Sequence, residues 1–276
     1  MKTISLCTVS IESLKPYLDL MIKSALDKLT NLHEIIICTV DAGTAPERKF
    51  KVGNVNIRRI SSPYSKDFSH ALGLHECIDN SEADYIMFCD PDIIFHTDVD
   101  DLYFNLMEKY NINYIGCAHE HFNKQPYGGF PCVVNSLVKK TDLPNVNFLE
   151  TYLYYNSDLR PNPINYEKLK KATGKYLIPG AIPELVDKFE KVDDPFFDTG
   201  CNLYLWSKQQ NWRWLSFLAP DIQNYKTTFY RTNFKLKDSI KLKKILYHQC
   251  GTRRTEGFEK FQQVYQKLKE EDNEGN

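Results

Sequence analysis

The sequence lacks the features that mark several large protein classes. No apolar run approaches the ~20 residues that a membrane-spanning helix needs, and the strand-like N-terminal stretch is too short to be the apolar region of a signal peptide. Lysine and arginine (35) nearly balance aspartate and glutamate (36), whereas a general nucleic-acid-binding protein would show a basic excess. These absences predict a protein that has no transmembrane segment and binds no nucleic acid.

Paired cysteines and glycine-rich loops are also missing. The eight cysteines are scattered and form no Cys-x-x-Cys pair, which argues against a zinc site or a disulfide framework. Cys7, Cys38 and Cys89 lie inside apolar strand patterns, as small buried side chains do in a reducing compartment, so we expect a cytoplasmic protein. Neither Gly-x-Gly-x-x-Gly nor a Walker sequence occurs, which argues against a dinucleotide oxidoreductase and a P-loop NTPase.

The sequence does contain a regular alternation of strand-like and helical patterns. Its 276 residues are 42% hydrophobic, enough for one large α/β domain with a smaller lobe or a C-terminal extension. The alternation fits right-handed βαβ units, so we expect a mostly parallel sheet of a nucleotide-binding type in the first ~115 residues. Strands are predicted at residues 3–9, 34–40, 55–60 and 85–89, and helices at 12–29 and 69–78.

One of these predicted strands runs directly into Asp90-Pro91-Asp92. An apolar run with no polar alternation predicts a strand buried on both faces. Pro91 cannot donate to a sheet ladder, so the strand should end there. Asp90 and Asp92 are thereby predicted at the carboxyl end of a central strand, where open α/β sheets bind their ligands. Such a carboxylate pair suits a hard divalent cation, although Asp and Pro are also ordinary residues of a strand-exit turn.

The second half of the chain has a looser predicted organisation. A helix is expected at residues 99–110 and a strand at 113–118, followed by a loop-dominated region from 119 to 183 that is suited to substrate contacts. Asp198 precedes a predicted helix at 201–210, where its simplest role is to cap that helix. A strand is expected at 212–218, the last ordered element at 242–254, and a frayed acidic tail from Glu270.

In this order, the motifs resemble those of the GT-A fold of nucleotide-sugar-dependent glycosyltransferases. The residues that carry the resemblance are Ser5 to Ser10, Asp41, Ser69 to Leu74, Asp90-Pro91-Asp92, Asp198-Thr199-Gly200, and His248 in Tyr-His-x-x-Gly. The resemblance implies one domain over residues 1–255, with a nucleotide-sugar-binding half (1–115) and an acceptor-binding half (116–255), and a helical or frayed tail at 256–276. It also implies an α/β, Rossmann-like fold with a mostly parallel central sheet, flanking helices and a loop-rich acceptor region. More loosely, the chain resembles the soluble glycosyltransferases of large algal viruses.

The resemblance further implies a role for each matching residue. Asp92 would coordinate a metal ion, Asp90 would touch the ribose or a metal-bound water, and His248 would complete the metal site. The remaining donor-binding residues would be Thr8, Val9, Ser10 and Asp41 at the base and ribose, Arg253 or Arg254 at the diphosphate, and His70 nearby. The cofactor would be Mn²⁺, or Mg²⁺ in its place. The expected donor is a nucleoside diphosphate sugar, above all a UDP-sugar, and the acceptor a glycan or another hydroxyl compound.

The stereochemistry and two other functional classes stay open at this point. Where the usual inverting pattern has Glu-Asp at the acceptor helix, this chain has Asp198-Thr199-Gly200. We expect inversion with Asp198 as general base, and the alternative is a retaining enzyme, because Asp-x-Asp with a late His also occurs in retaining families. A phosphohydrolase of the haloacid dehalogenase kind also has Asp-x-Asp after an apolar strand, but it requires Thr or Val where this chain has Ile94. A non-catalytic nucleotide-sugar-binding module is the last alternative.

Overall fold

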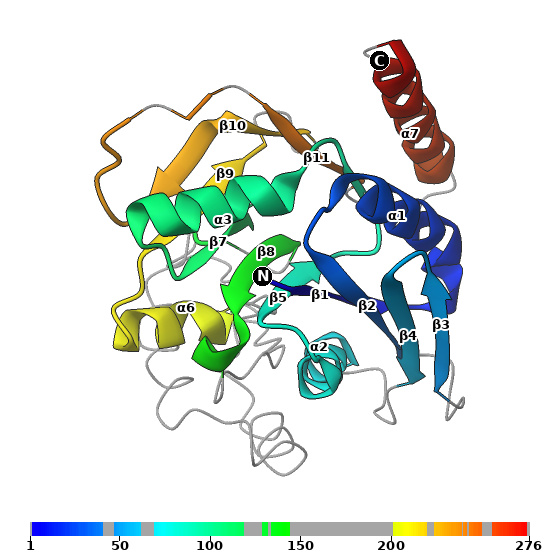
Figure 1. Cartoon of the computed structure of the whole chain (residues 1–276), viewed down its shortest axis with the longest axis horizontal. Helices are drawn as coiled ribbons and strands as arrows, with labels where there is room; N and C mark the ends of the chain where they lie inside the picture. The colour runs from blue at the N-terminus through cyan, green and yellow to red at the C-terminus, as the bar shows by residue number, and fades with distance from the viewer. Residues whose placement is uncertain are drawn as a thin grey trace, which may run out of the picture.

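The computed structural model describes residues 2–40, 47–61, 69–118, 129–131, 134–143, 201–219, 224–238, 240–241, 243–249 and 256–274. In these residues, helices cover both faces of a central sheet (Figure 1). The helices are α1 (Lys15–Lys28), α2 (Ser69–Asn80), α3 (Val99–Tyr110), α6 (Cys201–Gln209) and α7 (Glu256–Glu274), with short 3₁₀ turns η1 (Glu12–Leu14) and η4 (Lys140–Asp142).

Eleven strands among the described residues form the sheet. They are β1 (Ile4–Ser10), β2 (Leu32–Thr39), β3 (Arg48–Val52), β4 (Val55–Ser61), β5 (Tyr85–Cys89), β6 (Ile93–Phe95), β7 (Tyr114–Ala118), β8 (Asn135–Lys139), β9 (Trp214–Leu218), β10 (Asn224–Thr232) and β11 (Lys244–His248). Their order across the sheet is β3-β4-β2-β1-β5-β8-β7-β9-β10-β11-β6. The predicted α/β class is therefore confirmed.

The predicted parallel pairing holds in the N-terminal half and not across the whole sheet. Neighbours β4, β2, β1 and β5 run parallel, and β7 runs parallel to β9. The six other described pairs are antiparallel, so the sheet is mixed. The antiparallel pairs come from the β3–β4 hairpin at one edge and from the strands that follow β5 in the sheet order.

The two faces of the sheet carry separate apolar cores. On one face, α1 and α3 pack through residues at helical spacing, such as Leu18, Met21 and Ile22. On the other face lie Leu74 of α2 and Leu203 of α6. Strand β5 contributes to both cores, with Met87 in the first and Phe88 in the second. This confirms the prediction that the strand before Asp90 is buried on both faces.

The path of the sheet explains how the second half of the chain reaches the end of β5. Only Asp90, Pro91 and Asp92 separate β5 from β6, and a connection of that length spans at most about 14 Å. Yet β6 is the last strand in the sheet order, six places from β5. The strands between them must therefore curl back, so that β11 and β6 lie close to the carboxyl end of β5.

The described residues of the predicted loop-dominated region, 119 to 183, include β8, which pairs with both β5 and β7. The loop-rich character of the whole region stays a prediction, whereas two predictions about the C-terminal end of the chain were wrong. The last ordered element is α7 and not the segment at 242–254, and α7 continues past Glu270 to Glu274. An ion pair of 2.6 Å between Lys28 and Asp272 and another between Lys269 and Asp27 hold the end of α7 against α1, which explains why it does not fray.

Candidate metal and donor site

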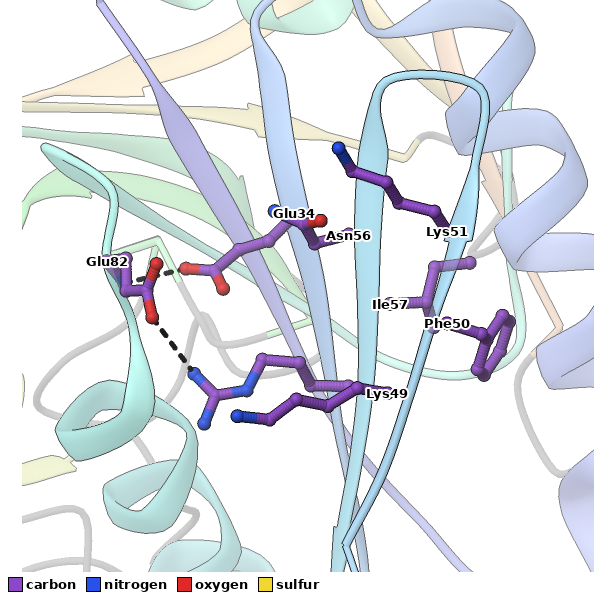
Figure 2. Close-up of a pocket in the computed structure, with 8 residues that line it drawn as sticks. Glu34, Lys49, Phe50, Lys51, Asn56, Ile57 and Glu82 are labelled. Atoms are coloured by element: carbon purple, nitrogen blue, oxygen red, sulfur yellow. Dashed lines mark hydrogen bonds and ion pairs between the residues drawn. The ribbon is translucent and has the colours of Figure 1, made fainter.

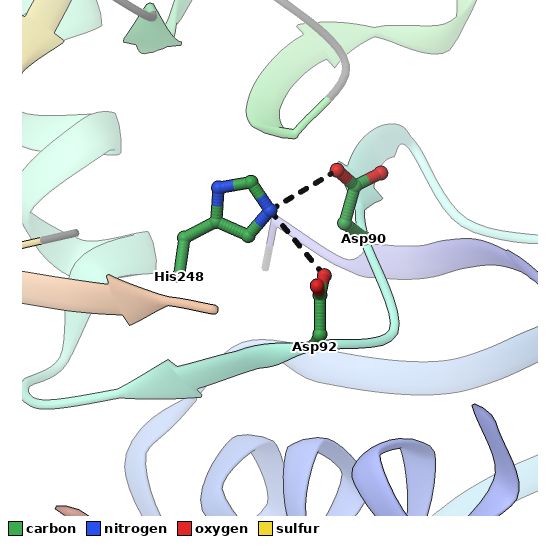
Figure 3. A group of neighbouring side chains, drawn as sticks. All are labelled: Asp90, Asp92 and His248. Atoms are coloured by element: carbon green, nitrogen blue, oxygen red, sulfur yellow. Dashed lines mark ion pairs between the residues drawn. The ribbon is translucent and has the colours of Figure 1, made fainter. Parts of the chain in front are cut away.

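Three side chains from two distant segments meet at the carboxyl end of β5. Asp90 and Asp92 lie in the turn between β5 and β6, and His248 is the last residue of β11 (Figure 3). Strand β11 pairs with β6 in the register His248 to Ile93, and the backbone N–H of Gln249 donates to the carbonyl of Asp92 at 3.0 Å. The β6–β11 ladder therefore fixes His248 beside Asp92.

The imidazole of His248 faces both carboxylates. Its Nε2 lies 3.3 Å from Asp92 Oδ1 and 3.6 Å from Asp90 Oδ2. The side chains of His248 and Asp92 are 7% and 9% exposed, whereas that of Asp90 is 22% exposed. The position of Asp90 is also set by its backbone N–H, which donates to the carbonyl of Val134 at 2.8 Å. Asp92 and His248 thus form the enclosed part of the cluster, and Asp90 forms its rim.

The donor set and its spacing fit a divalent cation. One ligand atom from each of Asp90, Asp92 and His248 lies within 4.8 Å of the other two. Two ligands about 2.1 Å from one ion lie about 3.0 to 4.2 Å apart, and both distances from Nε2 fall in that range. Two carboxylates and one imidazole are ligands that Mn²⁺ and Mg²⁺ accept. A proton on Nε2 would satisfy the same arrangement when no metal is bound.

The charges of the carboxylates raise the pKa values of two buried neighbours. Burial raises the pKa of the Cys89 thiol, and the charges of Asp90 and Asp92 raise it further. Burial and the charge of Asp92 likewise raise the pKa of Tyr17, an α1 residue that is 4% exposed. Both groups are therefore neutral at physiological pH. Cys89 and Tyr17 therefore add no negative charge to that of the two carboxylates.

The donor-binding residues predicted on β1 lie at the expected end of the sheet. Because β1 and β5 are parallel, with Cys7 opposite Phe88, the carboxyl end of β1 lies beside Asp90. Thr8, Val9 and Ser10 are all buried there, and among the described residues the Thr8 hydroxyl has no hydrogen-bond partner. His70 lies in the first turn of α2 and is half-buried; within the described residues it is not part of the Asp90, Asp92 and His248 cluster. The donor-binding roles of these residues stay predictions.

Four predicted site residues lie outside the described residues, namely Asp41, Asp198, Arg253 and Arg254. The sequence also left three neighbours of the cluster unassigned, which are Tyr17, Tyr247 and Gln249. The hydroxyl of Tyr247 donates to Gln249 Oε1 at 2.6 Å, and both residues are buried. The sequence signal that could have identified Tyr247 and Gln249 is their spacing on either side of His248, because residues two apart in an extended segment share one face.

A hollow of about 380 Å³ lies on the β3–β4 hairpin, away from this cluster (Figure 2). Several of its charged side chains contact one another, nearby backbone or Glu47. Arg58 lies 3.0 Å from Glu47 and 3.8 Å from Glu82, and the buried Glu34 accepts a 2.7 Å hydrogen bond from the backbone of Glu82. Arg58 also donates to Asn80 Oδ1 of α2 at 3.1 Å, so its contacts attach the hairpin to the end of α2, and we assign no function to this hollow.

None of the helices in the described residues is long and apolar enough to cross a membrane.

The sequence matches no protein-family model, and no curated protein is significantly similar to it.

Solved structures that are similar to this chain include S. aureus TarS 1-349, with 10% identity and a TM-score of 0.40 over 54% of this chain and 50% of TarS. The same protein in complex with UDP-GlcNAc matches with 10% identity and a TM-score of 0.40, over 54% of this chain and 48% of that one. The glycosyltransferase GlyE of Streptococcus pneumoniae TIGR4 matches with 12% identity and a TM-score of 0.44, over 80% of this chain and 46% of GlyE. This chain thus spans about half the length of each match. Similarities at this level assign no function, which has to be argued from the site itself.

Proposed function

We propose that this protein is a metal-dependent glycosyltransferase that moves a hexosyl or pentosyl group from a nucleoside diphosphate sugar to a hydroxyl acceptor. The observation that carries the proposal is the convergence of Asp90, Asp92 and His248 at the carboxyl end of β5. That edge is where an α/β sheet of this kind binds ligands. An enclosed pair of ligands with a more exposed carboxylate at the rim suits a cation that is shared with a diphosphate.

Each residue of the cluster has a distinct part in this proposal. Asp92 and His248 would hold the cation, because they are the two least exposed members. Asp90, at the rim, would contact the ribose of the donor or complete the metal site. When bound, the cation, Mn²⁺ or Mg²⁺, would neutralise charge that develops on the departing diphosphate.

The transfer itself needs groups on the donor and on the acceptor. Arg253 or Arg254 would neutralise the diphosphate as the bond between it and the anomeric carbon breaks. The acceptor oxygen then forms the new bond to that carbon, and its proton goes to the carboxylate of Asp198, which acts as general base. This assignment makes the enzyme inverting, and a retaining enzyme is the alternative if Asp198 is only a helix cap. Thr8, Val9, Ser10, Asp41 and His70 are the proposed contacts to the base and ribose of the donor.

A panel of UDP- and GDP-sugars, each incubated with and without Mn²⁺, tests the proposal. A glycosyltransferase is expected to release sugar slowly from one selected donor, only with the metal, and His248→Ala should lose this release. Release of inorganic phosphate would instead indicate a phosphohydrolase. Metal-dependent binding of a donor without any turnover, in the presence of candidate acceptors, would indicate a binding module.

A further inference from the structure

The C-terminal helix α7 is attached to the body of the protein by one apolar stripe and by the two ion pairs at its end. Phe261, Tyr265 and Leu268 of this helix are 0%, 8% and 4% exposed. The opposite side of α7 carries exposed polar residues, including Glu259, Gln263 and Gln266. A helix with a single apolar stripe takes its stability mainly from the surface on which that stripe packs. The identity of that surface therefore decides what α7 can influence.

The stripe packs on α1 and on the β6 and β11 strands that adjoin the candidate metal ligands. Tyr17, Ile94 and Tyr247 form one buried cluster with Phe261. The Phe261 ring lies 5.1 Å from the Tyr17 ring and 6.2 Å from the Tyr247 ring, measured between centroids. Tyr247 directly precedes His248, and Ile94 is two residues after Asp92. In the β6–β11 ladder, Tyr247 is paired with Ile94 and His248 with Ile93, so the same short ladder supports α7 and holds the cluster.

The first turn of α7 comes close to the same place. A Cβ atom at Gly257 would lie 3.1 Å from the hydroxyl oxygen of Tyr17 and 3.6 Å from Nε2 of Gln249. Gln249 in turn donates its backbone N–H to the carbonyl of Asp92 and accepts a hydrogen bond from Tyr247. The start of the helix thus abuts Gln249, whose side chain is hydrogen-bonded to Tyr247 and whose backbone is hydrogen-bonded to Asp92.

From these contacts we infer that docking of α7 positions Asp92 and His248, and that Phe261 is the central positioning residue. The inference rests on the proposed metal site and adds a dependence of metal affinity on a helix that supplies no ligand. Because β6 is only three residues long and β11 five, the ladder has few hydrogen bonds of its own to fix the ligands. Loss of the ring that covers Tyr247 and Ile94 should let the two ligand residues shift relative to each other.

Mn²⁺ binding to the full chain, measured by titration calorimetry, tests this coupling. Phe261→Ala is expected to raise the Mn²⁺ dissociation constant about 10- to 100-fold, the usual effect of losing a residue that orients metal ligands. Phe261→Leu, which keeps an apolar side chain of similar length, should recover most of the affinity. Gln263→Ala changes an exposed residue of the same helix and should bind Mn²⁺ as the wild type does. Circular dichroism and a thermal melt establish that each variant is folded at the temperature of the titration.

A second measurement uses the unchanged protein and does not depend on how well a variant folds. Coupling is reciprocal, so saturating Mn²⁺ should slow hydrogen exchange at the amides of α7 by the same factor by which docking strengthens metal binding. The slowing should disappear in His248→Ala. A wild type that binds Mn²⁺ while exchange in α7 is unaffected, or a folded Phe261→Ala with wild-type affinity, would refute the coupling alone. A wild type that binds no Mn²⁺ would refute the metal site of the proposed function, and the coupling with it.

Discussion

Replacing Asp92 by asparagine removes one negative charge from the candidate metal site and keeps the shape of the side chain. The side chain is 9% exposed and its Oδ1 lies 3.3 Å from Nε2 of His248, so a ligand there would be desolvated and well placed. The backbone carbonyl of Asp92, which accepts from Gln249, is unaffected by the change. We expect the affinity for Mn²⁺ to fall by about 100-fold or more, because even residues that only orient metal ligands contribute about 10- to 100-fold.

A thermal melt with and without Mn²⁺ turns this loss into a measurable shift. A ligand that binds only the folded state stabilises it by about 2.7 kcal/mol at a concentration 100 times its dissociation constant. A chain of this size gains roughly 2 to 4 °C in Tm for each kcal/mol, so the wild-type Tm should rise by roughly 5 to 10 °C. At the same Mn²⁺ concentration a 100-fold weaker variant gains only about 0.4 kcal/mol, or about 1 °C.

Asp84→Asn is the matched control for this experiment. Asp84 lies directly before the amino end of β5, where its Oδ2 accepts hydrogen bonds from the backbone and the hydroxyl of Thr3. The control removes the same charge at the other end of the same strand, so its Mn²⁺ shift should equal that of the wild type. A folded Asp92→Asn protein that keeps the full shift would show that Asp92 is not a ligand. The main support of the proposed function would then be lost.

Three further changes test other parts of the argument. Asp198→Asn keeps a capping oxygen but removes the base, so turnover should fall ~10²–10⁴-fold with donor affinity unchanged; near-normal turnover in a stable variant would favour the retaining alternative. Thr8→Val removes a buried hydroxyl that has no hydrogen-bond partner in the described part of the chain, so it should raise stability by about 1 kcal/mol. It should also weaken donor binding if that hydroxyl contacts the donor, and calorimetry of folding and of binding separates the two effects. Burial and, to a smaller extent, the charge of Lys244 lower the pKa of His96 to about 4. Between pH 6.5 and 4 the unfolded chain therefore binds a proton at His96 and the folded protein does not. The folded state should lose about 1.4 kcal/mol of stability for each pH unit as the pH falls through this range. Urea unfolding at several pH values should show this slope, and a His96→Leu protein with the same slope would contradict the assignment.

The sequence predicts the N-terminal half of the fold because its signals there are local. The apolar run before Asp90 becomes β5, buried on both faces, and the helical spacing at 99–110 becomes α3 with the same bounds. Each of these patterns fixes its own element within a few residues of chain. The position of Asp90 and Asp92 at a strand end follows from Pro91 alone, without any long-range contact.

The elements that were missed show no local pattern that identifies them, because they depend on distant partners or lack a buried face. The residues of β8 show no strand pattern of their own. They form a strand because they pair with β5 on one side and with β7 on the other. Strand β3 is exposed at all five positions, so it shows no buried face that a pattern could reveal. Helix α7 was expected to be helical or frayed, and what decides between the two is its packing on Tyr17 and Tyr247.

The candidate site shows the same division between local and long-range information. The two carboxylates were found from a local pattern, whereas His248 was assigned only through a resemblance, because no local feature of the sequence brings β11 to β6. What brings it there is the curl of the sheet, which the short β5–β6 connection requires. In that ladder, alternate residues of β11 face opposite sides, so Tyr247 meets α7 while the next residue, His248, meets Asp90 and Asp92. A strand with this alternation cannot move its histidine without also moving the tyrosine that supports α7, and this is the physical reason to expect that metal binding and helix docking depend on each other.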